Sequence, residues 1–208
     1  IVRAAKSIIF WSLPALVLLI VLRAQVVRVI LGSGSFDWTA TRLTAATLAL
    51  FTLSIVMQSL GLLFVRGFYA TGDNKIPLIA NTLSAIIIIL GGYGLLVWFE
   101  QSVFLQDFIT SLLRVESLSG SEVLMLPLAY SMGTFFNTLL LIYLFRRRFG
   151  SLLSPLKKTL IQGLFSSLVA GIVAYEFLEV FGLYLNLDTF WGIFIQGFAG
   201  GVAGLLTW

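Results

Sequence analysis

Long runs of residues with almost no charge limit this chain to very few folds. Three runs, at residues 43–65, 76–99 and 123–145, contain no charged residue at all. A helix needs roughly 20 apolar residues to cross the hydrocarbon core of a bilayer. These three runs are therefore predicted to be transmembrane helices.

A fourth run lies near the start of the chain, between Lys6 and Arg23, and contains Pro14. The residues after Arg23 stay largely apolar, so we expect the same helix to continue to about Ile30.

Two more runs lie at residues 159–181, with Glu176 near the end, and at 189–208. The chain begins with Ile1 and not Met, and Trp208 lies inside the last apolar run. We therefore expect a fragment of a longer polypeptide whose last helix is truncated.

The composition agrees with a lipid environment. Hydrophobic residues make up 59% of the chain and charged residues 11%, and the mean hydropathy is +1.04. The six runs do not alternate apolar and polar residues, as the strands of a membrane barrel would. The expected fold class is an all-α integral membrane protein with a bundle of about six transmembrane helices.

Basic residues gather on one side of this topology. Short loops rich in Lys and Arg stay in the cytoplasm. One side holds nine of the thirteen basic residues: Arg3, Lys6, Arg66, Lys75, Arg146, Arg147, Arg148, Lys157 and Lys158. The other side holds Arg23, Arg28, Arg42 and Arg114 together with most of the acidic residues. We predict a multi-pass protein of the bacterial inner (plasma) membrane with its N-terminus in the cytoplasm. This topology explains the net charge of +4, so no nucleic-acid partner is predicted.

Residues that usually carry catalysis are missing from this sequence. It has no Cys and no His, and no paired carboxylates face each other within the apolar runs. We therefore predict no catalytic residues, no cofactor and no metal site, and a membrane enzyme is the weaker alternative.

Small residues in the last two runs favour close helix packing. The glycines concerned are Gly163, Gly171, Gly197, Gly200, Gly201 and Gly204.

The predicted outer loop 101–122 is a candidate surface helix. Its apolar residues fit a stripe with a period of 3.6 residues, which is typical of an amphipathic helix on a membrane surface. The stripe consists of Val103, Phe104, Phe108, Leu112 and Val115.

A short polar segment joins the second and third predicted helices. It reads Arg66-Gly67-Phe68-Tyr69-Ala70-Thr71-Gly72-Asp73-Asn74-Lys75-Ile76-Pro77. Asp73 is suited to cap the next helix, and Pro77 lies near its start, where a missing N–H costs least. Arg66 and Tyr69 are suited to the headgroup region. A tight cytoplasmic hairpin is predicted.

The same residue order, R-x-F-Y-A-x-x-D-x-x-x-P, resembles a hairpin of MurJ (MviN-type) lipid II flippases. These belong to the multidrug/oligosaccharidyl-lipid/polysaccharide exporter superfamily. The residues that carry the resemblance are Arg66, Phe68, Tyr69, Ala70, Asp73 and Pro77.

Weaker similarities lie on either side of the hairpin. Leu13-Pro14-Ala15, the loop Gly34-Ser35-Phe36-Asp37 and the stretch from Ser131 to the Arg146-Arg147-Arg148 turn are similar to family segments in the same order. The resemblance implies that residues 1–150 form four helices of the C-terminal lobe of a fourteen-helix, two-lobe transporter. Residues 151–208 would add two C-terminal helices.

The resemblance implies a function as well as a fold. Such a protein would flip undecaprenyl-linked peptidoglycan precursor from the cytoplasmic to the outer leaflet by alternating access, for cell-wall synthesis. Its expected partners are this lipid-linked precursor, the bilayer and the cell-wall synthesis machinery. Among the arginines present, Arg23 and Arg28 are the candidates for a substrate cavity, although snorkelling to the outer headgroups also explains them.

One departure from the family pattern concerns ion coupling. Some members carry polar cation ligands in the helix after the hairpin, where this sequence has Ile88 and Gly92. Two other functions stay open: a different polysaccharide-lipid flippase or drug exporter of the same superfamily, and a non-transporting membrane scaffold.

Overall fold

A computed structural model of the chain describes residues 1–32, 38–116, 118–150, 153–187 and 189–208. The described residues form helices and connecting turns, with no β-strand among them. The helices are α1 (Val2–Val21), α2 (Arg23–Leu31), α3 (Trp38–Ala70), α4 (Lys75–Gln101), α5 (Val103–Leu113), the 3-10 helix η1 (Ser121–Leu124), α6 (Met125–Phe149), α7 (Leu153–Tyr184) and α8 (Phe190–Thr207). The predicted Gly34–Asp37 similarity lies outside the described residues.

Six segments in the described part are long and apolar enough to cross a membrane. They are Val2–Val21, Trp38–Ala70, Lys75–Gln101, Ser121–Phe149, Leu156–Tyr184 and Phe190–Thr207. Large apolar side chains such as Leu78, Ile89 and Phe165 are more than 60% exposed on their outer faces, which suits contact with lipid. The prediction of an all-α bundle with six transmembrane helices is confirmed.

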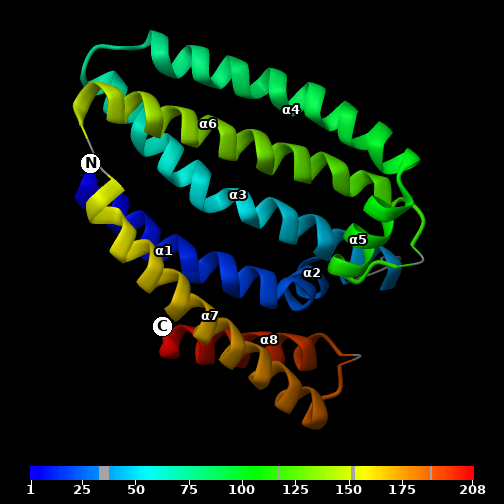
Figure 1. Cartoon of the computed structure of the whole chain (residues 1–208). Helices are drawn as coiled ribbons and strands as arrows, with labels where there is room; N and C mark the ends of the chain where they lie inside the picture. Colours follow the sequence, from blue (N-terminus) through cyan, green and yellow to red (C-terminus); the bar gives the residue numbers. More distant parts are fainter. Residues whose placement is uncertain (33–37, 117, 151–152, 188) are drawn as a thin grey trace.

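The long helices lie side by side in the order α4, α6, α3, α1, α7, α8 (Figure 1). Helix α6 packs between α3 and α4, and α7 packs between α1 and α8. Sequence neighbours α3 and α4 therefore touch little, because α6 separates most of their length. The core lies along these helix contacts.

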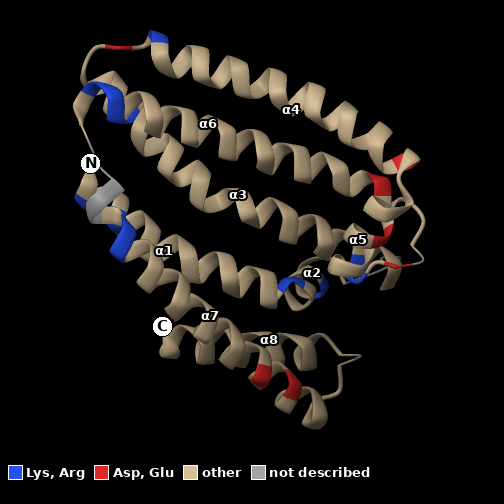
Figure 2. Ribbon diagram, in the orientation of Figure 1, with Lys and Arg blue, Asp and Glu red and all other residues tan. Residues whose placement is uncertain are grey.

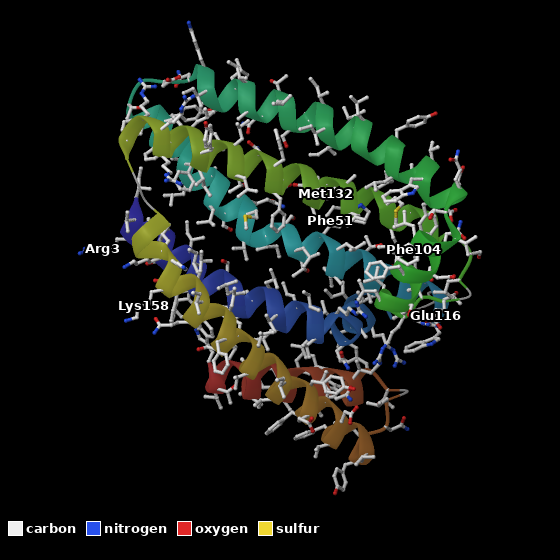
Figure 3. The ribbon with its side chains drawn as sticks, in the orientation of Figure 1. Arg3, Phe51, Phe104, Glu116, Met132 and Lys158 are labelled. Carbon is white, nitrogen blue, oxygen red and sulfur yellow. The ribbon has the colours of Figure 1, made fainter. Side chains whose placement is uncertain are left out.

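Charged residues gather at the two ends of the bundle (Figure 2). In Figure 3, Arg3 and Lys158 lie at one end and Glu116 lies at the opposite end. We call these the basic end, which carries the chain start and the turn between α3 and α4, and the acidic end, which carries α2 and α5. The nine basic residues assigned to one side of the topology share the basic end.

The first predicted helix is broken and not continuous. Helix α1 ends at Val21 and α2 begins at Arg23, because Leu22 adopts ψ 5° and so leaves α-helical geometry. Helix α2 packs on α3 and α8, whereas α1 packs mainly on α3 and α7. The predicted extension to Ile30 is therefore helical but changes its packing partners.

Helix α5 occupies the predicted surface segment, with one correction to the stripe. Val103, Phe104, Phe108 and Leu112 are at least half exposed and form one apolar face turned away from the bundle. Val115 is buried and lies beyond the helix end at Leu113, because Arg114 adopts the left-handed conformation that terminates α5.

Glycines let α1, α7 and α8 approach closely, as predicted. A Cβ atom on Gly171 would lie 2.5 Å from Val17, and one on Gly204 would lie 2.5 Å from Leu18 and 3.1 Å from the Ala170 carbonyl oxygen. The other four predicted glycines contact neighbouring helices in the same way: Gly163, Gly197, Gly200 and Gly201.

Hydroxyl groups tie α6 to both of its neighbours. Ser131 and Thr138 of α6 donate to the carbonyl oxygens of Leu50 and Met57 in α3, at 2.7 and 2.8 Å. Ser84 of α4 donates to the Gly133 carbonyl oxygen at 2.8 Å. Hydrogen bonds of this kind hold helices together where lipid gives no hydrophobic driving force.

Replacing Gly133 by Ala is expected to loosen the contact between α4 and α6. Its new Cβ would lie 2.2 Å from Cγ1 of Ile88, so overpacking should cost about 1–3 kcal/mol. Gly91→Ala on α4 is the matched control, because nothing lies within 4 Å of its Cβ position. Unfolding in detergent should show destabilisation by Gly133→Ala only, and Ile88→Ala should relieve it. Equal stability of the two glycine variants would contradict this packing.

Candidate functional site

The hairpin between α3 and α4 is built by a helix stop followed at once by a helix start. The N–H of Gly72 donates to the Tyr69 carbonyl oxygen at 3.0 Å, and the N–H of Asp73 donates to the Phe68 carbonyl oxygen at 3.1 Å. Gly72 has φ +76°, a left-handed conformation that glycine adopts at little cost. This pattern is a Schellman motif, and it ends α3.

Asp73 then starts α4. Its Oδ1 atom accepts hydrogen bonds from the backbone N–H groups of Lys75 and Ile76, both at 3.2 Å. These N–H groups would otherwise lack a partner at the helix start. The predicted capping role of Asp73 is confirmed.

The other oxygen of Asp73 ties the hairpin to α6. Its Oδ2 atom forms an ion pair with the guanidinium group of Arg148. The backbone N–H of Ile76 and this guanidinium hold the pKa of the Asp73 carboxyl below its ordinary value of 3.8. The carboxylate therefore joins α4 to α6 at the basic end, and the backbone N–H of Asp73 adds a hydrogen bond to α3.

The predicted hairpin residues divide into a buried and an exposed set. Phe68 and Pro77 are buried, and the ring centroid of Phe68 lies 5.3 Å from that of Phe145 in an edge-to-face contact. Arg66, Tyr69 and Ala70 are exposed. Buried members fix the hairpin, so the exposed members are the ones free to meet a ligand.

Arg66 and Ala70 line a cavity at the basic end. This cavity has a volume of about 560 Å³, and its other lining residues are mainly apolar, including Ile1, Phe145 and Phe149. An arginine beside apolar walls suits an amphipathic molecule with a negative group.

Arg23 lies in a larger cavity at the acidic end, which we call the arginine cavity. It has a volume of about 730 Å³ and lies among α2, α3, α5, α7 and α8. Its charged lining residues are Arg23, Arg42, Arg114 and Glu179. Arg28, the other predicted cavity residue, does not line it, and its guanidinium lies 5.2 Å from the ring centroid of Trp38. Of the two predicted cavity residues, Arg23 therefore lines this cavity and Arg28 does not.

Sequence reasoning missed Arg42, Arg114 and Glu179 as partners of Arg23. These residues come from α3, the end of α5 and α7, and no local spacing links them. Only the packing of the helices brings them to one cavity.

A third cavity, of about 590 Å³, lies among α3, α4 and α6 and is lined by both polar and apolar side chains. Asn137 donates to Oδ1 of Asn81 at 2.9 Å across it. Ile88 packs against Gly133 at its wall, and Gly92 lies near Ala129 and Leu126. The two positions singled out for missing cation ligands therefore make hydrocarbon contacts. Among the described residues, no three His, Cys, Asp or Glu side chains group as metal ligands would.

Replacing Asp73 by Ala should lower the melting temperature by about 2–4 °C, because α4 loses its cap and α6 loses an ion pair. The lowered pKa means that Asp73 stabilises the fold above pH 3.8 and that this contribution disappears as pH falls through the folded-state value. Melting curves in detergent from neutral to acid pH should thus converge for the original and variant proteins. Asp107→Ala is the control, because Asp107 is an exposed residue of α5. A similar fall in its melting temperature would contradict the capping role of Asp73.

Comparison with known protein families gives a match. The model of the family described as "Lipid II flippase MurJ" matches residues 1–194. Neither the curated proteins nor the solved structures contain a match to this chain. The family match spans nearly all of the bundle, from α1 into α8, and includes the hairpin and the four charged residues of the arginine cavity. The chain therefore belongs to the lipid II flippase MurJ family.

Proposed function

We propose that this protein flips undecaprenyl-linked peptidoglycan precursor, lipid II, from the cytoplasmic to the outer leaflet by alternating access. The observation that carries the proposal is the family match over residues 1–194 on a bundle of six membrane-spanning helices. Flipping breaks and forms no covalent bond, so the protein's task is to carry a charged head group past hydrocarbon.

The charge distribution supports an orientation for this transport. Nine basic residues share the basic end, and four share the acidic end with most carboxylates. We propose that the basic end, with the chain start, faces the cytoplasm of a bacterium. The hairpin and Arg66 would then meet the precursor on the side where it is made, and the arginine cavity would lie on the outer side.

The proposal divides the chain at residue 150, after the end of α6. Helices α7 and α8 pack on each other and reach the rest of the bundle mainly through α1 and α2. We propose that residues 1–150 form four helices of the C-terminal lobe of a fourteen-helix transporter and that 151–208 form two additional helices. The proposed partners are the lipid-linked precursor and the cell-wall synthesis machinery.

The exposed and buried hairpin residues have different proposed roles. Arg66 would hold the negatively charged head group, because it is exposed and lines a cavity with apolar walls. Asp73 would keep the hairpin in place, because its carboxylate caps α4 and pairs with Arg148.

Complementation of a flippase-depleted bacterial strain with the full-length gene tests this function. The original gene should restore lipid II exposure at the outer leaflet, measured by labelling of the exposed precursor. Arg66→Ala should reduce the exposure rate about tenfold, the value of one hydrogen bond to a charged group. Lys75→Ala is the matched control, because this exposed lysine shares the hairpin without lining the Arg66 cavity.

Each other outcome counts against the proposal in a specific way. An original gene that leaves outer-leaflet precursor unchanged would overturn lipid II transport and favour another polyprenyl-linked sugar, a drug substrate or a scaffold role. Full activity of Arg66→Ala, with normal membrane levels of the variant, would remove Arg66 from the transport path.

A further inference from the structure

The third cavity lies between three membrane-spanning helices, α3, α4 and α6, and we call it the amide cavity. Its polar lining residues are Gln58, Ser59, Asn81, Ser84, Tyr130, Thr134, Asn137 and Thr138. None of the described residues that line it carries a charge. Its volume of about 590 Å³ lies within the range of small-molecule sites. Polar groups on membrane-spanning helices are costly unless they meet a partner, so this cavity is a candidate binding site.

Helix α6 turns a polar side to the amide cavity and an apolar side away from it. A stripe with helical spacing lines the cavity: Tyr130, Thr134, Asn137 and Leu141. A second stripe, two residues further along, has exposed and largely apolar side chains: Met132, Phe136, Leu139 and Tyr143. The two stripes lie about 200° apart around the helix, because each residue turns it by about 100°. The apolar stripe suits contact with lipid, whereas the cavity side suits a polar partner.

The hydroxyl groups of the amide cavity use their protons on backbone carbonyl groups. Thr138 and Ser84 donate to carbonyl oxygens of neighbouring helices, both at 2.8 Å. Thr134 and Ser59 donate to carbonyl oxygens of their own helices, at 2.8 and 2.9 Å. A hydroxyl group has one proton to donate and two lone pairs. These four groups therefore keep lone pairs that accept hydrogen bonds from a ligand.

An unmet amide oxygen adds a further acceptor. Nδ2 of Asn137 donates to Oδ1 of Asn81 at 2.9 Å. Oδ1 of Asn137 is buried and accepts no hydrogen bond within the described protein. Buried polar atoms normally have a hydrogen-bond partner. The amide cavity therefore calls for a ligand that donates hydrogen bonds.

The uncharged lining narrows the class of ligand. Cations at membrane depth are normally paired with a carboxylate, and no carboxylate is among the lining residues that the structure describes. A phosphate group accepts hydrogen bonds, so it is unsuited to a lining of acceptors. Sugar rings carry several hydroxyl donors without charge, and an N-acetylated sugar adds an amide N–H.

The amide cavity and the cavity that Arg66 lines lie on neighbouring faces of α3. Val65 lines the amide cavity, and Arg66, the next residue, lines the other cavity. One residue turns a helix by about 100°, so the two faces are adjacent. A head group that joins a negatively charged group to a sugar matches this pair of spaces.

We propose that the amide cavity binds an uncharged N-acetylated sugar of the precursor's head group. The hydroxyl and acetamido N–H groups of the sugar donate to Oδ1 of Asn137 and to the hydroxyl oxygens of Ser59 and Thr134, and its ring packs against Tyr130. Arg66 holds the negatively charged group next to the sugar. The inference rests on the proposed function, and it adds the residues that recognise the sugar.

Binding of free N-acetylglucosamine to the purified full-length protein in a neutral detergent tests the proposal. Saturation-transfer NMR would follow titrations with this sugar and with glucosamine, whose amine is charged. N-acetylglucosamine should bind saturably and about tenfold more tightly than glucosamine, because the uncharged lining gives a buried cation no counter-charge. Sodium chloride and inorganic pyrophosphate should each fail to displace the sugar.

Thr134→Val is the main test variant. The change keeps the shape of the side chain and removes a hydroxyl group whose hydrogen bond lies within α6, so the contacts between helices remain. The affinity for N-acetylglucosamine should fall about fivefold, the value of one neutral hydrogen bond, and Thr134→Ser should retain it. Thr47→Val is the matched control, because Thr47 makes the same kind of bond within α3, at 3.0 Å, outside the amide cavity. Its affinity should stay unchanged.

Several results would overturn the proposal. Tighter binding of glucosamine, or displacement by sodium chloride, would assign the amide cavity to a cation. Displacement by pyrophosphate would assign the sugar signal to a phosphate site. Equal losses in Thr134→Val and Thr47→Val, at unchanged melting temperature, would remove the amide cavity from sugar binding. A gene that restores lipid II exposure while the purified protein binds no sugar would overturn this inference alone and leave the flippase function standing.

Discussion

Close contact between helix backbones holds this protein together. In lipid, apolar side chains gain little by turning inward, so helices need dense packing and hydrogen bonds to associate. Both are present around α6 and α7. Ser131, Thr138 and Ser84 bond to carbonyl groups of neighbouring helices, and glycines on α7 and α8 admit side chains of α1 into the space that their own would fill. The two cavities at opposite ends of the bundle keep their shapes because these contacts fix the helices around them.

Much of this fold follows from the sequence, because the bilayer imposes strong limits. Runs of uncharged residues predict each crossing, and the distribution of Lys and Arg predicts which connections share one end of the bundle. The hairpin is also predictable, because adjacent residues form it. Gly72 ends α3 and Asp73 caps the start of α4. The orientation of the bundle in the membrane and the place of the chain in a larger transporter stay predictions.

Contacts between distant residues could not be predicted from the sequence. The break at Leu22 interrupts an apolar run that reads as one helix in the sequence, and beyond it α2 packs on α3 and α8. Arg23 and Arg28 look equivalent in the sequence, yet one lines a cavity and the other lies over Trp38. Arg114 joins Arg23 only because α5 stops beside α2 and α3. Each of these features depends on tertiary packing, which no local pattern records.

The bend at Leu22 also gives α2 a mechanical role. Because α2 contacts both α3 and α8, it connects these two helices directly. Their other connection runs through the contacts of α1 and α7. Arg23 is the first residue of α2, and Gln25 lies in the first turn of the same helix. A shift of α8 relative to α3 would therefore move Arg23 and Gln25. It would also change the distances between the guanidinium groups of the arginine cavity. The dimensions of the arginine cavity are thus linked to the relative positions of α3 and α8.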